Sequence, residues 1–78
     1  MTRVIKNHEG FYFKQGGGWT VVFDGAESFH DINSVISTKV RHRLQGVDLV
    51  LVLNDLPSPG WDVVLPLLDT RHEGPSLT

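Results

Sequence analysis

The segment Leu49–Leu53 most restricts what this chain can fold into, because five apolar, strand-forming residues follow one another without a polar break. Leucines alternate with valines, so a strand formed here carries apolar side chains on both of its faces. A strand half exposed to water would instead alternate apolar with polar residues. The residues from Val47 to Asn54 are therefore predicted to form a strand that is covered on both sides.

Two segments rich in aromatic and β-branched residues, 11–15 and 19–23, flank the glycines Gly16–Gly18. Glycine reaches positive φ angles without a Cβ clash, so this arrangement predicts a β-hairpin. A last strand is predicted from Trp61 to Leu65, after a turn over residues 54–60. Pro66 lacks a backbone donor, which favours an edge position for that strand or its end at the proline.

A helix is predicted between the hairpin and the apolar strand, because six apolar residues recur there at helical spacing: Phe29, Ile32, Val35, Ile36, Val40 and Leu44. Ser28 is expected to cap its N-terminus with Asp31 as capping-box partner, and Gly46 is expected just past its C-terminus.

These elements predict an α+β fold, with a four-stranded antiparallel sheet in ββαββ order and one helix packed across one face. With 78 residues the chain has room for one domain, expected over residues 1–68, followed by a polar tail over 69–78. The helix is expected to cover the face that carries Phe11, Phe13, Trp19, Val21, Phe23, Leu49, Leu51 and Leu53.

The cysteine content, the net charge and the length of the apolar runs exclude or disfavour several classes of function. The absence of cysteine excludes disulfides, thiol catalysis and cysteine-ligated zinc, and favours a cytoplasmic location. A net charge of −2 argues against dedicated binding of duplex nucleic acid. No apolar run has the length of a signal peptide or a membrane span, so no membrane attachment is expected. No motif calls for a cofactor or a metal.

The sheet face opposite the helix carries the main functional prediction. One helix cannot cover both faces of the sheet, and the second face would expose Tyr12, Val22, Val50, Val52 and Val64. An open apolar patch of this kind is typical of an association surface. We therefore expect a homodimer or another protein partner here, in which case Val52→Asp should shift the protein toward monomer. The alternative is that the first ten residues or the tail cover this face.

A basic cluster at the predicted helix end comprises Lys39, Arg41, His42 and Arg43. It is either a solvated end that complements the helix dipole, or a contact for a protein partner or RNA. Trp19 and Trp61 each begin a predicted strand, and each is either a core residue or an anchor for a partner.

Catalytic and metal-binding patterns are weak. The histidines His8, His30, His42 and His72 show no helical metal-ligand spacing. Ser28, His30 and Asp31 lie too close in sequence for a catalytic triad. The glycine run is not followed by the lysine and helix of a phosphate-binding loop. The sequence therefore does not predict an enzyme.

Size, surplus apolar sheet surface and weak catalytic patterns together predict a non-catalytic protein-binding module. Small accessory or inhibitor proteins of this type are typical of phages and mobile elements, where they block a host machine by occupying a surface. The alternative is a small nucleic-acid-binding or regulatory protein that uses the basic helix end. Phosphate binding would weaken steeply with added salt, whereas binding through the apolar sheet face would hardly change.

Overall fold

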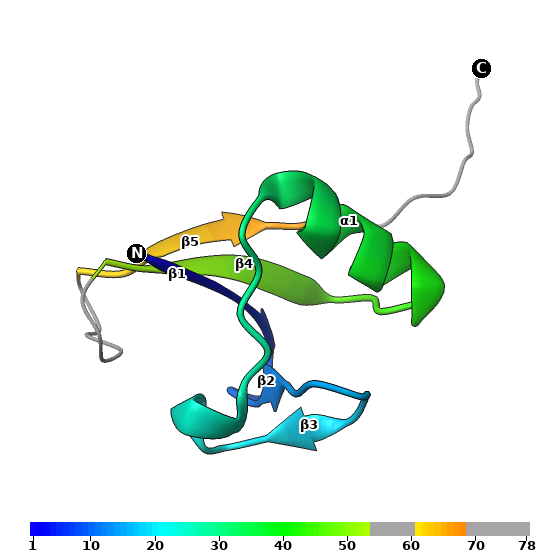
Figure 1. Ribbon diagram of the computed structural model, residues 1–78, viewed down its shortest axis with the longest axis horizontal. Coiled ribbons are helices and arrows are strands. Elements are labelled where there is room, and N and C mark those ends of the chain that lie inside the picture. Colours follow the sequence, from blue (N-terminus) through cyan, green and yellow to red (C-terminus); the bar gives the residue numbers. More distant parts are fainter. Residues whose placement is uncertain (54–60, 69–78) are drawn as a thin grey trace.

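The computed structural model describes residues 1–53 and 61–68, which form an α+β fold of one helix against one open antiparallel sheet (Figure 1). The predicted turn over 54–60 and the predicted tail over 69–78 lie outside the described residues. Helix α1 spans Ile32–Arg41, and a short 3-10 turn, η1, spans Phe23–Gly25. The strands are β1 (Thr2–Asn7), β2 (Tyr12–Phe13), β3 (Trp19–Thr20), β4 (Val47–Val52) and β5 (Val63–Pro66).

The sheet has five strands rather than the predicted four, in the order β3-β2-β1-β4-β5. The additional strand, β1, lies at the centre and pairs antiparallel with β4 along its whole length, from Thr2 opposite Val52 to Asn7 opposite Val47. Only Val4 and Ile5 are buried in it. The sequence offers Val4 and Ile5 as a short additional strand, and the observed strand is longer because its polar residues also pair with β4.

The core is divided between the two faces of the sheet. On the helix face, the side covered by α1, the buried cluster comprises Ile5, Phe13, Phe29, Val35, Val47 and Leu49. On the opposite side, the far face, it comprises Val4, Tyr12, Val50 and Val52. The apolar strand is thus covered on both sides, as its pattern predicts.

The hairpin is shorter than the predicted segments 11–15 and 19–23. Lys14 N–H donates to the Gly18 carbonyl and Gly17 N–H to the Lys14 carbonyl, closing a turn in which all three glycines have positive φ angles. The chain leaves the strand after Thr20 and enters η1, so strand alternation stops. Phe11 precedes β2 and Val21 follows β3, so both lie outside the strands and are exposed. Phe23 packs against the far face instead of the helix face.

The connection from η1 to α1 is held against the sheet by backbone hydrogen bonds, and Figure 1 shows it crossing from the hairpin to the helix. Glu27 N–H donates to the Phe13 carbonyl, and Phe29 N–H donates to the Arg3 carbonyl. The Arg3 guanidinium donates to the His30 carbonyl at 3.0 Å. Phe29 is therefore part of the extended connection and is buried from there, whereas its spacing predicted a position on the helix.

The helix begins three residues later than predicted, because Asp31 and not Ser28 is its N-cap. The Asp31 carboxylate accepts a 2.8 Å hydrogen bond from Ser34 N–H, which satisfies one of the free donors of the first turn. This hydrogen bond lowers the pKa of Asp31, because it favours the charged form. In the described part of the chain, no helix is long and apolar enough to cross a bilayer.

The helix also ends earlier than predicted, in a Schellman motif. Leu44 N–H donates to the Lys39 carbonyl and Arg43 N–H to the Val40 carbonyl. Arg43 has a φ angle of 55°, so an arginine occupies the left-handed C′ position that glycine favours and for which Gly46 was predicted. A side chain in this conformation is strained by crowding against its own backbone.

Replacing this residue in the variant Arg43→Gly is expected to stabilise the protein by about 0.5–1 kcal/mol, because glycine adopts the left-handed conformation without the Cβ clash. Urea denaturation monitored by circular dichroism measures the change. Gly46→Ala is the matched opposite, since Gly46 also has a positive φ of 64°, and it should destabilise. A loss of stability in Arg43→Gly would show that the arginine side chain contributes more than its backbone strain costs.

Candidate protein-binding surface

Three of the five residues predicted to form an exposed far-face patch are buried. Tyr12, Val50 and Val52 belong to the far-face cluster and have almost no surface left for a partner. They are packed against Phe23 and Ala26, which lie in and after η1. The Tyr12 and Phe23 rings make an edge-to-face contact with centroids 5.7 Å apart. The open patch expected at this face is therefore absent, and among the described residues Phe23 and Ala26, not the first ten residues, pack against it. The alternative that the tail covers this face lies outside the described residues.

The far face is also polar around its buried cluster. Lys6 places its ammonium 5.4 Å from the centre of the Tyr12 ring, in cation–π range. Burial raises the pKa of Tyr12, and the Asp62 carboxylate raises it further because a second negative charge nearby is unfavourable. These features further reduce the apolar character that the sequence predicts for this face.

The other two predicted residues, Val22 and Val64, are exposed, by 56% and 53%. They do not form one patch. Val22 follows β3 at one edge of the sheet and Val64 lies in β5 at the opposite edge. Val64 lies opposite Val50 and is therefore on the predicted far face, but at the β5 edge of the sheet and away from Val22.

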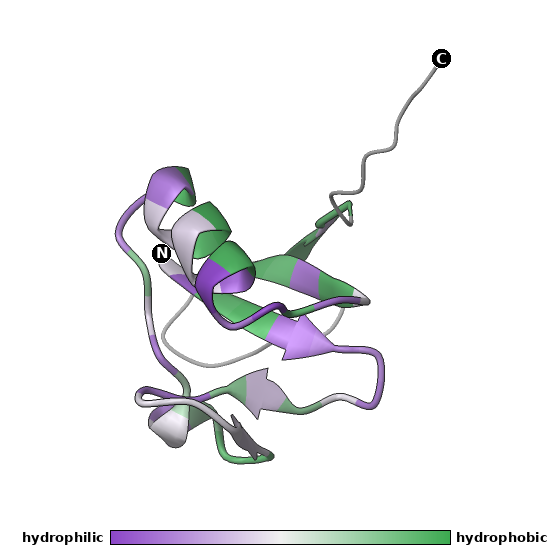
Figure 2. Ribbon diagram, turned by 90° about the vertical axis from the view of Figure 1, so that its right-hand side faces the viewer, coloured by the Kyte–Doolittle hydropathy of each residue, from purple (hydrophilic) through white to green (hydrophobic). Residues whose placement is uncertain are grey.

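The apolar surface that the fold leaves open lies along β5 and one flank of α1. All four residues of β5 are exposed. On α1, exposed apolar residues recur every four positions and so form one stripe. Figure 2 shows the hydrophobic side of α1 turned toward the β5 side of the sheet and its hydrophilic side turned away. We call this the β5–α1 surface and define it by Ile32, Ile36 and Val40 on α1, Val63 and Leu65 on the helix face of β5, and Val64 on the far face of the same strand.

The outer edge of β5 adds backbone groups to this surface. Leu67 N–H donates to the Val47 carbonyl of β4 at 3.2 Å. Backbone groups of successive residues in a strand point to opposite sides, so Val63 and Leu65 direct theirs toward β4, and Val64 and Pro66 direct theirs outward. Because proline has no N–H, Val64 is the residue of β5 that offers both a donor and an acceptor at the outer edge.

The structure does not bring the predicted basic cluster together. Lys39 is only 5% exposed, whereas Arg41, His42 and Arg43 are exposed. The His42 ring lies 5.0 Å from the Phe13 ring, across the hairpin side of the helix end. Arg41 lines a polar hollow of about 390 Å³ on the opposite flank from Val40, together with Glu27 and Asp31. Arg41 therefore lies on a different flank of α1 from Lys39 and does not join it in one basic patch.

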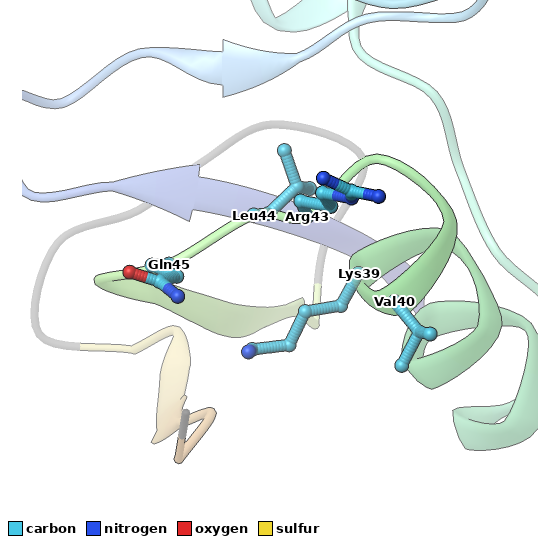
Figure 3. Close-up of a pocket in the computed structure, with 5 residues that line it drawn as sticks. All are labelled: Lys39, Val40, Arg43, Leu44 and Gln45. Carbon is cyan, nitrogen blue, oxygen red and sulfur yellow. The ribbon is translucent and has the colours of Figure 1, made fainter. Parts of the chain in front are cut away.

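A second hollow, of about 200 Å³, lies at the C-terminal end of α1 and is lined by Lys39, Val40, Arg43, Leu44 and Gln45. Figure 3 shows the Lys39 ammonium and the Arg43 guanidinium directed away from each other. Two cations that diverge do not form a clamp for one phosphate. The Val40 side of this hollow continues into the β5–α1 surface.

The two tryptophans have different environments. Trp19 packs against the helix-face cluster, with its ring edge-to-face on Phe13 at a centroid distance of 5.7 Å. Trp61 is 73% exposed and precedes β5, which places it next to the β5–α1 surface. Of the two predicted anchors, Trp61 is the one with surface available to a partner.

The residue types that support catalysis or metal binding are dispersed. Within residues 1–53 and 61–68, no three His, Asp or Glu side chains gather as metal ligands. Asp31 caps α1, whereas Ser28 and His30 lie in the extended connection before it. No hydrogen bond links these three side chains into a catalytic relay in the described part of the chain. His72 lies outside the described residues.

Sequence reasoning missed the helix stripe as an exposed feature. Ile32, Ile36 and Val40 were assigned to the core because they recur at helical spacing with Val35. The angle that the apolar residues span around the helix axis is the sequence signal that could have revealed this exposed stripe. With Ile32 and Val40 included, this angle is wider than the part of a short helix that one sheet face can bury.

Comparison of this chain with protein-family models, curated proteins and solved structures finds no match.

Proposed function

We propose that this protein is a non-catalytic protein-binding module that engages its partner through the β5–α1 surface, as a small accessory or inhibitor protein. The observation that carries the proposal is the exposure of β5. Three consecutive apolar residues, Val63, Val64 and Leu65, are open to water on both faces of an edge strand. Monomeric proteins rarely leave such a contiguous apolar strand uncovered.

The adjoining helix stripe supports the same function. Ile36 and Val40 are 42% and 59% exposed and extend the apolar area from the sheet edge onto α1. The exposed Trp61 beside β5 is a residue type enriched among interface anchors. An edge strand with a neighbouring stripe of exposed apolar side chains suits the addition of a partner strand, in which backbone hydrogen bonds supply affinity and side-chain contacts supply specificity.

The proposal is tested by comparing what wild type and two matched variants capture from a lysate of the source organism. Val64→Asp places a charge on the β5–α1 surface, whereas Val22→Asp places one at an equally exposed valine outside it. We expect wild type and Val22→Asp to retain the same proteins and Val64→Asp to retain them at least about tenfold less well, the equivalent of about 1.4 kcal/mol. Equal capture by all three proteins would overturn the assignment of this surface.

Folding of each variant is checked by circular dichroism and thermal unfolding, since both substitutions are at exposed positions and should leave the fold intact. Capture is repeated after nuclease treatment and across a salt series. Retention that disappears with nuclease and falls steeply with salt would assign the protein to nucleic-acid binding instead.

A further inference from the structure

We propose that the occupant of the β5–α1 surface is a second copy of this chain, paired through antiparallel β5 strands about a two-fold axis at Val64. This inference rests on the proposed function and names the partner of the same surface. The two five-stranded sheets would then join edge to edge into one continuous sheet, with both α1 helices on the same side.

The backbone of β5 suits self-pairing. A strand that meets its own copy across a two-fold axis perpendicular to the sheet must run antiparallel to it. If Val64 lies opposite Val64 of the second copy, each valine donates its outward N–H to the other's carbonyl and both groups are satisfied. In the same register Pro66 lies opposite residue 62, also at a hydrogen-bonded position. Pro66 can accept from the residue 62 N–H, but it has no N–H to donate, so each end of the pairing lacks one hydrogen bond.

The side chains that this register brings together are apolar on both faces. Val63 of one copy lies directly opposite Leu65 of the other on the helix face, and the two Val64 side chains meet on the far face. Because the axis keeps both helices on the same side, the Ile36 and Val40 flanks turn toward the joined edge from either side. One contact patch therefore complements itself, which is the requirement for a closed dimer.

Area and charge are compatible with a stable dimer. The exposed area of the β5–α1 surface together with Trp61 and Leu68 is on the order of 800 Å² per copy, so complete coverage would reach the contribution of each partner to a standard interface. Residues 63–68 carry no charge. Asp62 lies opposite Pro66 of the second copy, so the two Asp62 carboxylates stay apart on either side of the axis. The other edge strand, β3, has two residues and offers a shorter template.

Sedimentation velocity across a dilution series tests the pairing. We expect wild type and Val22→Asp to sediment as dimers at micromolar concentration, and Val64→Asp to dissociate at least about tenfold more readily, because two aspartates would lie directly opposite each other. Wild type that remains monomeric up to high micromolar concentration would overturn the inference.

Single cysteines then locate the axis, because the chain has none of its own. Directly opposite residues in a hydrogen-bonded antiparallel pair have Cα atoms about 5.5 Å apart, within the roughly 4.4–6.8 Å that a disulfide spans. Val64→Cys should therefore oxidise to a covalent dimer well ahead of Val22→Cys. Equal oxidation of the two variants would reject pairing at β5.

The outcomes separate this inference from the proposed function. A monomeric wild type whose capture of other proteins is lost in Val64→Asp rejects the second copy and leaves the binding function standing. A wild-type dimer cross-linked through residue 64, with capture of other proteins unchanged in Val64→Asp, supports the pairing and rejects the binding of other proteins through this surface.

Discussion

The substitution Val52→Asp is expected to unfold the domain rather than to change its oligomeric state. Val52 is 0% exposed and packs in the far-face cluster with Val4 and Val50. A carboxylate at this position would lose its hydration without gaining a partner, and Asp62 lies at the next register position across β5. We expect a loss of about 4–5 kcal/mol, comparable to the whole stability of a small domain.

Thermal and urea unfolding of Val52→Asp, followed by circular dichroism, measures this loss. Val64→Asp is the matched control, because it introduces the same charge on the same face one strand away, at a residue that is half exposed. The control should stay within about 0.5 kcal/mol of wild type in the monomer. A Val52→Asp protein that melts like wild type but sediments as a smaller species would instead restore the far face as the interface.

The substitution Phe13→Ala is expected to reduce the free energy of unfolding by about 3–5 kcal/mol, the usual cost of removing a buried aromatic ring. Phe13 is 2% exposed and contacts both the Trp19 ring and the His42 ring. It thereby joins the hairpin to the end of α1. The cavity left by alanine would remove that junction as well as the apolar contacts of the ring.

Phe11→Ala is the matched control for this prediction, since Phe11 lies two residues away and is 37% exposed. Strand alternation predicts that both phenylalanines are in the core, whereas the structure buries only Phe13. Comparing the two variants therefore tests the burial seen in the structure against the burial expected from the sequence. Urea denaturation should show a loss in Phe11→Ala well below that in Phe13→Ala. Equal losses would mean that Phe11 is as deeply packed as Phe13.

Local patterns predicted the elements with strong periodicity. The apolar strand is β4, and the glycine turn joins β2 to β3. The last predicted strand is β5, although it begins at Val63 instead of Trp61 and includes Pro66. The ends of α1 were misplaced at both termini because several residues could serve as caps. Asp31 competes with Ser28, and Arg43 adopts a conformation for which glycine is the usual choice. Which cap is used depends on how the preceding segment is tied to β1 through Arg3 and Phe29.

The predicted open patch on the far face was wrong for Tyr12, Val50 and Val52, which are buried, whereas Val22 and Val64 are exposed at opposite edges of the sheet. Alternation along β4 shows that its second face is apolar, yet it contains no information on what covers that face. Phe23 and Ala26 cover it because the chain turns through η1 after β3 and passes over the sheet. The apolar residues left exposed are those on β5 and the α1 flank, since the helix lies over the centre of the sheet and does not extend over its edge.

The sequence by itself determined the secondary-structure type of the strongest segments, the α+β class and the presence of more apolar surface than one helix can cover. These properties depend on residues near one another in the chain, whose spacing decides which side of a strand or helix they share. Only the tertiary structure decided the central position of β1, the covering of the far face by η1 and the exposure of β5. Those features depend on contacts between segments that are distant in sequence. Several arrangements are compatible with the local patterns, and the one that buries the whole core most favourably is the one that forms.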